Sequence, residues 1–134
     1  MTELSDNARP LVSFVVIAYN VESYIERCLH SALEQVGASF EVIVVDDAST
    51  DATPDLIEAA AVDDGRIRFV KRSQNGGAHL ARKTGVLQSV GQFVYFVDGD
   101  DEVTPHFLEL VVGLVGHRRA EMYRLGCRVV AQGY

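Results

Sequence analysis

The sequence predicts an α/β fold in which helices cover both faces of a mostly parallel sheet, as in Rossmann-like domains. Short apolar runs rich in β-branched residues alternate with segments of helical periodicity along most of the chain. Such alternation implies right-handed crossovers and a parallel sheet. The length of 134 residues, 48% of them hydrophobic, suits one domain with one core. We expect residues 1–10 to form a flexible N-terminus and residues 11–134 to form the domain.

The first strand and helix are predicted between residues 13 and 35. Residues 13–18 (SFVVIA) are a short apolar run of the kind that forms a buried strand. Residues 23–35 have helical periodicity, and Ser23 with Glu26 predicts a capping box at the start of this helix. Its apolar face consists of Ile25, Cys28, Leu29, Ala32 and Leu33.

A second strand, a second helix and a third strand follow. Residues 40–45 (FEVIVV) have the composition of a buried strand. Thr53 is expected to be the N-cap of the next helix and Pro54 its first-turn residue. Residues 67–70 are the third predicted strand. The apolar positions of the helix between the two strands are Leu56, Ile57, Ala60 and Ala61.

Glycine and proline mark the predicted boundaries of the remaining elements. A glycine pair at residues 76–77 opens a loop before a third helix, which Gly91 is expected to end as a C-terminal cap. Residues 92–97 (QFVYFV) are the fourth strand. A Thr-Pro pair at residues 104–105 predicts the start of a fourth helix, and residues 122–130 a weaker fifth strand.

Composition and charge exclude several classes of protein. The formal net charge is −7, whereas a non-specific nucleic-acid binder needs basic surface. No apolar run approaches the roughly 20 residues of a membrane span. The polar N-terminus lacks the apolar segment of a signal peptide, so we expect a cytoplasmic protein. Cys28 and Cys127 are too few for a disulfide framework, and Cys28 is expected to pack in the core.

Unusual polar residues follow the predicted strands where each strand ends. In open parallel sheets, ligands bind at the carboxyl ends of the strands, near a switch in strand order. We therefore expect the side chains that follow the first, second and fourth strands to form one site. The candidates are Tyr19, Asn20, Asp46, Asp47, Asp98 and Asp100.

The carboxylates of this set indicate a cation. Asp98, Asp100 and Asp101 lie close together in sequence, and they repel each other unless a cation or several donors compensate. A hard divalent cation takes oxygen ligands, which an Asp-x-Asp element supplies. The alternative is a solvated turn with helix-capping aspartates, and Asp46 with Asp47 could cap the helix near residue 53 in the same way. Acidic groups on two separate strand ends favour the ligand site.

Basic residues gather between residues 66 and 83, where no acidic residue occurs. This local excess can attract a diphosphate. Arg82 follows the glycine-rich loop and is the best candidate for such a contact, whereas Arg66 and Arg68 fit a solvated strand edge better.

Four blocks of the sequence resemble the signatures of family-2 glycosyltransferases, in the same order and with the same spacing. They lie at residues 12–20 (VSFVVIAYN), 41–51 (EVIVVDDASTD), 75–85 (NGGAHLARKTG) and 96–105 (FVDGDDEVTP). The resemblance implies the nucleotide-sugar-binding half of an inverting, metal-dependent enzyme with a GT-A fold. It also implies a nucleotide diphosphate sugar as donor, with a UDP-sugar as the expectation, and a sugar or lipid-linked acceptor.

The same resemblance implies roles for particular residues. Tyr19 would lie against the nucleotide base and Asp47 would accept a hydrogen bond from it. Asp98 would lie near the ribose or the donor sugar, and Asp100 would bind Mn²⁺ or Mg²⁺ at the diphosphate. These roles suit the chemistry of an aromatic ring, a carboxylate acceptor and a Lewis acid. No general base is identified, because Glu109 and Glu121 are expected to be surface residues, so the catalytic residue stays unknown.

Other readings remain open. The chain could be a truncated, inactive fragment that serves as an interaction module, or a phospho-receiver signalling domain. A dinucleotide-binding domain lacks support, because the turn after the first strand has no glycine fingerprint. We expect self-association through the edge of the last strand. The family resemblance suggests the inner membrane face, where the arginines after residue 117 could meet anionic lipid.

Overall fold

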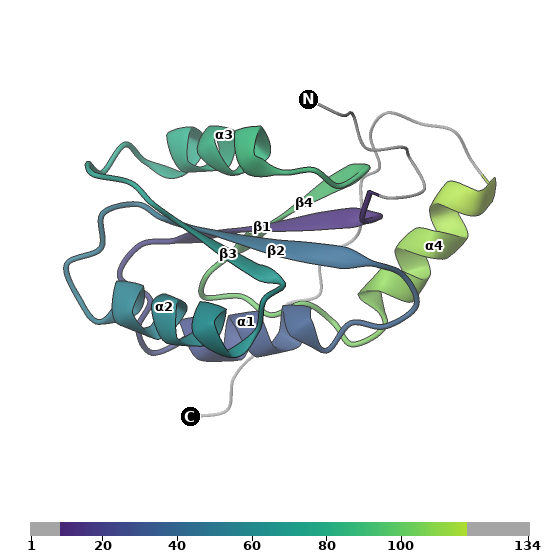
Figure 1. Cartoon of the computed structure of the whole chain (residues 1–134), viewed down its shortest axis with the longest axis horizontal. Helices are drawn as coiled ribbons and strands as arrows, with labels where there is room; N and C mark the ends of the chain where they lie inside the picture. The colour runs from purple at the N-terminus through teal and green to yellow at the C-terminus, as the bar shows by residue number, and fades with distance from the viewer. Residues whose placement is uncertain (1–8, 118–134) are drawn as a thin grey trace.

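The computed structural model describes residues 9–117, which form a four-stranded, all-parallel sheet flanked by helices (Figure 1). The strands are β1 (Val12–Ala18), β2 (Phe40–Asp46), β3 (Ile67–Lys71) and β4 (Phe93–Asp98). The helices are α1 (Ile25–Leu33), α2 (Thr53–Asp63), α3 (Ala78–Gln88) and α4 (Phe107–His117). The predicted fold class is confirmed, while the strand predicted at residues 122–130 lies outside the described residues.

Alternation along the strands divides the core between two helical layers. Phe14 and Val16 of β1 belong to the larger apolar cluster, which includes residues of α1, α2 and α4. Val15 and Ile17 point to the other face and pack with Ala81 of α3. Figure 1 shows α3 on one side of the sheet and α1 with α2 on the other, as the sequence predicted.

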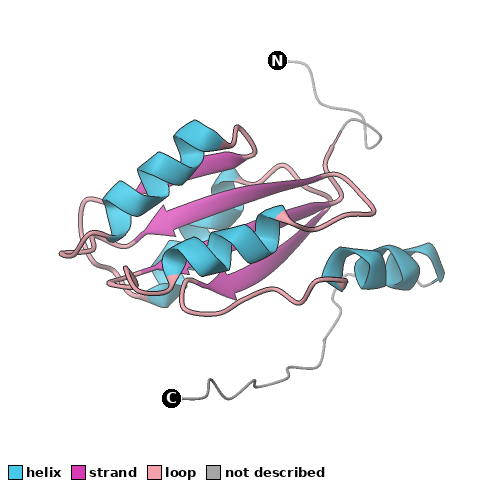
Figure 2. Ribbon diagram, turned by 90° about the horizontal axis from the view of Figure 1, so that it is seen from below, coloured by secondary structure: helices cyan, strands magenta, loops and turns pink. Residues whose placement is uncertain are grey.

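The sheet has the strand order β3-β2-β1-β4. The chain therefore adds strands in one direction from β1 to β3 and then crosses back to place β4 beside β1. Figure 2 shows the strands as one sheet with helices packed around it. This reversal creates a switch point at the carboxyl ends of β1 and β4, where ligands of such sheets bind. A phospho-receiver domain has the order 2-1-3-4-5, so the topology excludes that alternative.

The predicted capping box of α1 is wrong. The helix begins at Ile25, its N-cap is Tyr24, and no side chain caps it. The amides of Tyr24 and Ile25 both donate to the carbonyl of Val21, at 2.9 Å each. A backbone turn therefore holds the start of α1, and no side-chain cap is present.

Two other helix starts also differ from prediction. Ala52 is the N-cap of α2, and the Thr53 hydroxyl instead accepts the Val21 amide at 2.9 Å. Helix α4 begins at Phe107, whose amide donates to the Thr104 carbonyl, so residues 104–105 precede the helix. At α2 the Asp51 carboxylate accepts the Thr53 amide at 2.9 Å, so groups other than the predicted N-caps hold both helix starts.

The predicted end of α3 at Gly91 is wrong as well. The C-cap is Ser89, in an extended conformation. Gly91 lies against β1, where its amide donates to the Ser13 hydroxyl at 2.8 Å.

Among the described residues, no helix has the length and apolar character needed to cross a membrane.

Gly85 allows α3 to lie directly on the sheet, and its replacement by alanine is expected to destabilise the fold by about 2 kcal/mol. A Cβ at this position would overlap Cγ1 of Val15 and lie 3.3 Å from Cγ2 of Val45. Thermal or urea unfolding measures the change. The matched control is Gly65→Ala, because a Cβ at Gly65 meets nothing within 4 Å. Equal stability of the two variants would contradict the close approach.

Candidate functional site

The strand ends gather the predicted site residues at one edge of the sheet. β1 and β4 are in register with Ile17 opposite Asp98, and β1 and β2 with Ala18 opposite Asp46. The Ile17 carbonyl accepts the Gly99 amide at 2.8 Å, and the Ala18 carbonyl accepts the Asp47 amide at 2.9 Å. Two consecutive carbonyls of β1 thus hold the chain as it leaves both neighbouring strands.

The turn that follows β4, residues 98–101, is called the acidic turn below. One carboxylate oxygen each of Asp98, Asp100 and Asp101 lies within 4.8 Å of the others, and all three residues are exposed. The Asp101 amide donates to the Asp98 carbonyl at 2.9 Å and closes the turn. Gly99 is needed here, because a Cβ would lie 3.0 Å from the Ile17 carbonyl oxygen.

The electrostatics of the acidic turn favour a cation. Partial desolvation raises the pKa of Asp101 above its usual value, and the charges of Asp100 and Asp98 raise it further. Arg82 contributes little compensation, since its guanidinium is 3.9 Å from the Asp98 carboxylate and both side chains are about half exposed. Hard oxygen ligands that repel each other fit a divalent cation. The sequence pointed to Asp100 for the metal, and the structure brings Asp98 and Asp101 beside it.

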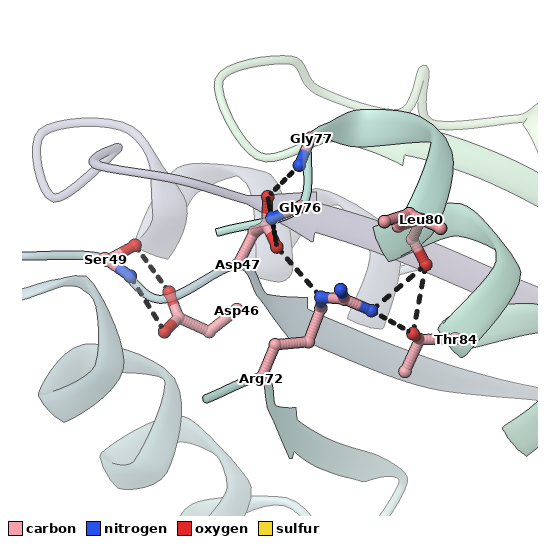
Figure 3. A network of polar contacts seen from close by, with 8 residues as sticks. All are labelled: Asp46, Asp47, Ser49, Arg72, Gly76, Gly77, Leu80 and Thr84. Atoms are coloured by element: carbon pink, nitrogen blue, oxygen red, sulfur yellow. Dashed lines mark hydrogen bonds and ion pairs between the residues drawn. The ribbon is translucent and has the colours of Figure 1, made fainter. Parts of the chain in front are cut away.

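Asp46 is the last residue of β2 and Asp47 follows it, and their carboxylates have different partners. Asp47 is buried on the α3 side, with 3% of its side chain exposed. Its carboxylate accepts Nε of Arg72 at 2.9 Å and the amides of Gly76 and Gly77 at 3.1 and 2.8 Å (Figure 3). One side chain thus fixes the loop between β3 and α3.

Arg72 extends this network into α3. Its Nη1 donates to the Thr84 hydroxyl at 2.6 Å, and that hydroxyl donates to the Leu80 carbonyl at 3.0 Å (Figure 3). Gly77 has φ +86°, a backbone conformation that favours glycine. The sequence had not separated Arg72 from the other basic residues, because no local spacing links it to a carboxylate 25 positions earlier.

Asp46 and Asn20 organise the loops after β2 and β1. Asp46 is completely buried and accepts both the amide and the hydroxyl of Ser49. Asn20 has φ 49°, and its side-chain oxygen accepts the Thr50 amide at 2.8 Å. Its own amide donates to the Ser49 hydroxyl at 3.0 Å. Neither Asp46 nor Asp47 caps α2, because the amide of its first residue, Thr53, instead donates to the Asp51 carboxylate at 2.9 Å.

The other candidate residues fall into two groups. Tyr19 is half exposed beside this edge, and Arg82 reaches toward it from α3. Arg66 and Arg68 are paired with Asp64 and Glu41, at 2.7 and 2.6 Å, and so are not free to attract a diphosphate.

The remaining predictions concern Glu109, Glu121 and Cys28. Glu109 packs against Gly37, in the connection that enters β2, which places it at the opposite end of the sheet from the acidic turn. Glu121 lies outside the described residues. Cys28 is buried as predicted, and burial, followed by the charges of Asp101 and Asp100, raises the pKa of its thiol to about 12.

The sheet order, with an acidic turn at the switch point, is that of a Rossmann-like α/β domain with a candidate ligand site at the carboxyl ends of its strands. Within that class, the chain belongs to glycosyl transferase family 2, whose sequence profile matches residues 13–131. The Bacillus subtilis protein TuaG, named as a teichuronic acid biosynthesis glycosyltransferase, is 36% identical over 126 residues. That alignment covers 94% of this chain and 50% of TuaG, so the chain spans half the length of this relative.

Solved structures agree with the assignment. The S. aureus TarS fragment 1–349 in complex with UDP-GlcNAc superposes with a TM-score of 0.76 at 31% identity, over 90% of this chain and 37% of that one. The mannosyltransferase PcManGT from Pyrobaculum calidifontis, in complex with GDP-Man and Mn²⁺, gives 0.70 at 29% identity, over 81% and 32% of the two chains. The expected family and GT-A fold are confirmed.

Proposed function

We propose that this chain is the donor-binding part of a glycosyltransferase that moves a sugar from a nucleoside diphosphate to an acceptor hydroxyl with inversion. The acidic turn at the switch point carries the proposal, because it sets three exposed carboxylates where a ligand of such a sheet binds. The nucleotide sugars in the TarS and PcManGT complexes support the donor class. A UDP-sugar is our choice of donor.

The acidic turn is the proposed metal site. Asp100 would hold Mn²⁺ or Mg²⁺, with Asp98 and Asp101 as the neighbouring carboxylates. Such a cation supplies Lewis-acid neutralisation of the leaving diphosphate. Arg82, half exposed beside Asp98, is placed to meet a phosphate or sugar oxygen from the α3 side.

The other residues form the proposed nucleoside subsite. Tyr19 offers an exposed ring for stacking on the base. Asp47 would accept a base N–H in addition to the three N–H groups that it already accepts. Asp46 and Asn20 act by holding the loops on which this subsite is built.

Further properties of the whole protein remain proposals of the same kind. A sugar or lipid-linked acceptor, a cytoplasmic location at the inner membrane face, and self-association all follow from the family resemblance and the sequence. The arginines invoked for anionic lipid lie outside the described residues. An interaction module without catalysis would keep the same fold, and only measurement of ligand binding separates the two.

Calorimetric titration of UDP into the protein, with and without Mn²⁺, tests the proposed function. We expect binding in the presence of Mn²⁺ and much weaker binding after chelation, because the carboxylates and the diphosphate repel each other without the metal. GDP is the control for base recognition by Tyr19 and Asp47. Absence of UDP binding under all conditions would refute the donor site and leave the interaction module.

A further inference from the structure

Helix α1 presents three polar side chains on one face, at positions i, i+3 and i+7. They are Cys28, Ser31 and Gln35, the last just beyond the end of the helix, and they are called the α1 clamp below. Cys28 is fully buried and Gln35 is 4% exposed. All three contact the chain that runs from the acidic turn to α4, which follows α1 in the same direction (Figure 1).

The first two members of the clamp hold the acidic turn at both ends. The thiol of Cys28 donates to the Asp98 carbonyl, with Sγ 3.6 Å from the oxygen. The Ser31 hydroxyl accepts the Val103 amide at 2.9 Å and donates to the Cys28 carbonyl at 2.6 Å. Asp100 and Asp101 therefore lie between two anchored backbone positions.

Gln35 anchors the rest of the connection. Its Nε2 donates to the Thr104 carbonyl at 2.8 Å and to the Ser31 carbonyl at 3.2 Å. Its Oε1 accepts the Leu108 amide at 2.9 Å. The Leu108 amide is in the first turn of α4 and has no partner within that helix. A side chain 73 residues away in sequence thus supplies the missing N-terminal cap.

We infer that Cys28, Ser31 and Gln35 are positioning residues for the metal-binding carboxylates, an inference that rests on the proposed function. Mutual repulsion among the exposed carboxylates tends to open the acidic turn in the absence of a cation. β1 restrains the start of the turn, where Asp98 is paired with Ile17 and the Gly99 amide donates to the Ile17 carbonyl. The α1 clamp supplies the restraint on the downstream side. It keeps Asp100 and Asp101 together before the metal arrives, so that binding requires little rearrangement.

The test compares Ser31→Ala and Gln35→Met with a matched control, Ser13→Ala. Ser13 is a buried serine that likewise accepts one backbone amide, that of Gly91, and donates one hydrogen bond, to Glu41. It holds the chain that enters β4, whereas Ser31 holds the chain that leaves it. Mn²⁺ affinity is measured by electron paramagnetic resonance at saturating UDP. Amide hydrogen exchange at Val103 and thermal unfolding are measured on the metal-free proteins.

We expect both clamp variants to bind Mn²⁺ about tenfold more weakly, as when outer partners of a metal site are lost. Exchange at Val103 should rise in Ser31→Ala. Ser13→Ala should lose comparable thermal stability but keep the wild-type Mn²⁺ affinity. Unchanged affinity in both clamp variants, or an equal loss in Ser13→Ala, overturns the inference. If Ser31→Ala does not fold, the Mn²⁺ affinity of Gln35→Met tests the inference by itself. Failure of the wild-type protein to bind Mn²⁺ would instead refute the proposed function itself.

Discussion

Replacement of Asp100 by alanine is expected to weaken Mn²⁺-dependent UDP binding by roughly a hundredfold or more. Loss of an outer partner of a metal site alone costs about 10–100-fold in affinity, and Asp100 is the proposed direct ligand. The same change should leave the fold intact, because Asp100 is exposed and its removal relieves repulsion with Asp98 and Asp101. The melting temperature of the metal-free variant should therefore equal or exceed that of the wild type.

Asp63→Ala is the matched control for this prediction. Asp63 is an exposed aspartate at the end of α2, so its replacement changes the net charge equally without touching the acidic turn. Calorimetry with and without Mn²⁺ gives the affinities of both variants. Wild-type affinity in Asp100→Ala would show that the metal, if bound, uses other ligands.

Replacement of Asp47 by alanine is expected to destabilise the protein by about 3 kcal/mol. The change leaves the Arg72 guanidinium, whose side chain is 21% exposed, without its carboxylate. It also leaves the amides of Gly76 and Gly77 without their acceptor. Denaturant unfolding measures the loss. UDP binding should weaken as well, because the loop between β3 and α3 loses its attachment to β2.

Arg66→Met provides the contrast for this second prediction. Arg66 also pairs with an aspartate, Asp64, at 2.7 Å, but both side chains are substantially exposed. Exposed pairs contribute about 0–1 kcal/mol, so the expected loss is small. A similar cost for Asp47→Ala and Arg66→Met would mean that burial of the Asp47 carboxylate contributes little to stability.

The sequence predicted the strands well because their side chains face two apolar layers, so the signal is local. The helix starts were predicted poorly. The carbonyl of Val21 accepts the amides at the start of α1, and the amide of Val21 donates to the Thr53 hydroxyl. Neither contact has a signature in the sequence near those helices. Capping rules describe isolated helix ends, and here neighbouring loops satisfy the same groups.

In the candidate site, too, local features were predictable from the sequence and contacts between distant residues were not. The position of Asp100 beside Asp98 was predictable because both follow one strand. The sequence did not pair Asp47 with Arg72 or Gln35 with Leu108, since these partners are 25 and 73 residues apart and meet only through the order of the strands. The residues proposed to bind the ligand left a local pattern in the sequence, whereas the residues that hold them in place did not.

The adjacent carbonyls of Ile17 and Ala18 have a consequence for binding thermodynamics. One holds the start of the acidic turn and the other holds Asp47, so both halves of the proposed donor site are attached to neighbouring peptide groups of a central strand. Such halves cannot separate without breaking the sheet. The two halves therefore have a fixed separation before a ligand that spans them binds. Little of the interaction energy of that ligand is lost in ordering the protein.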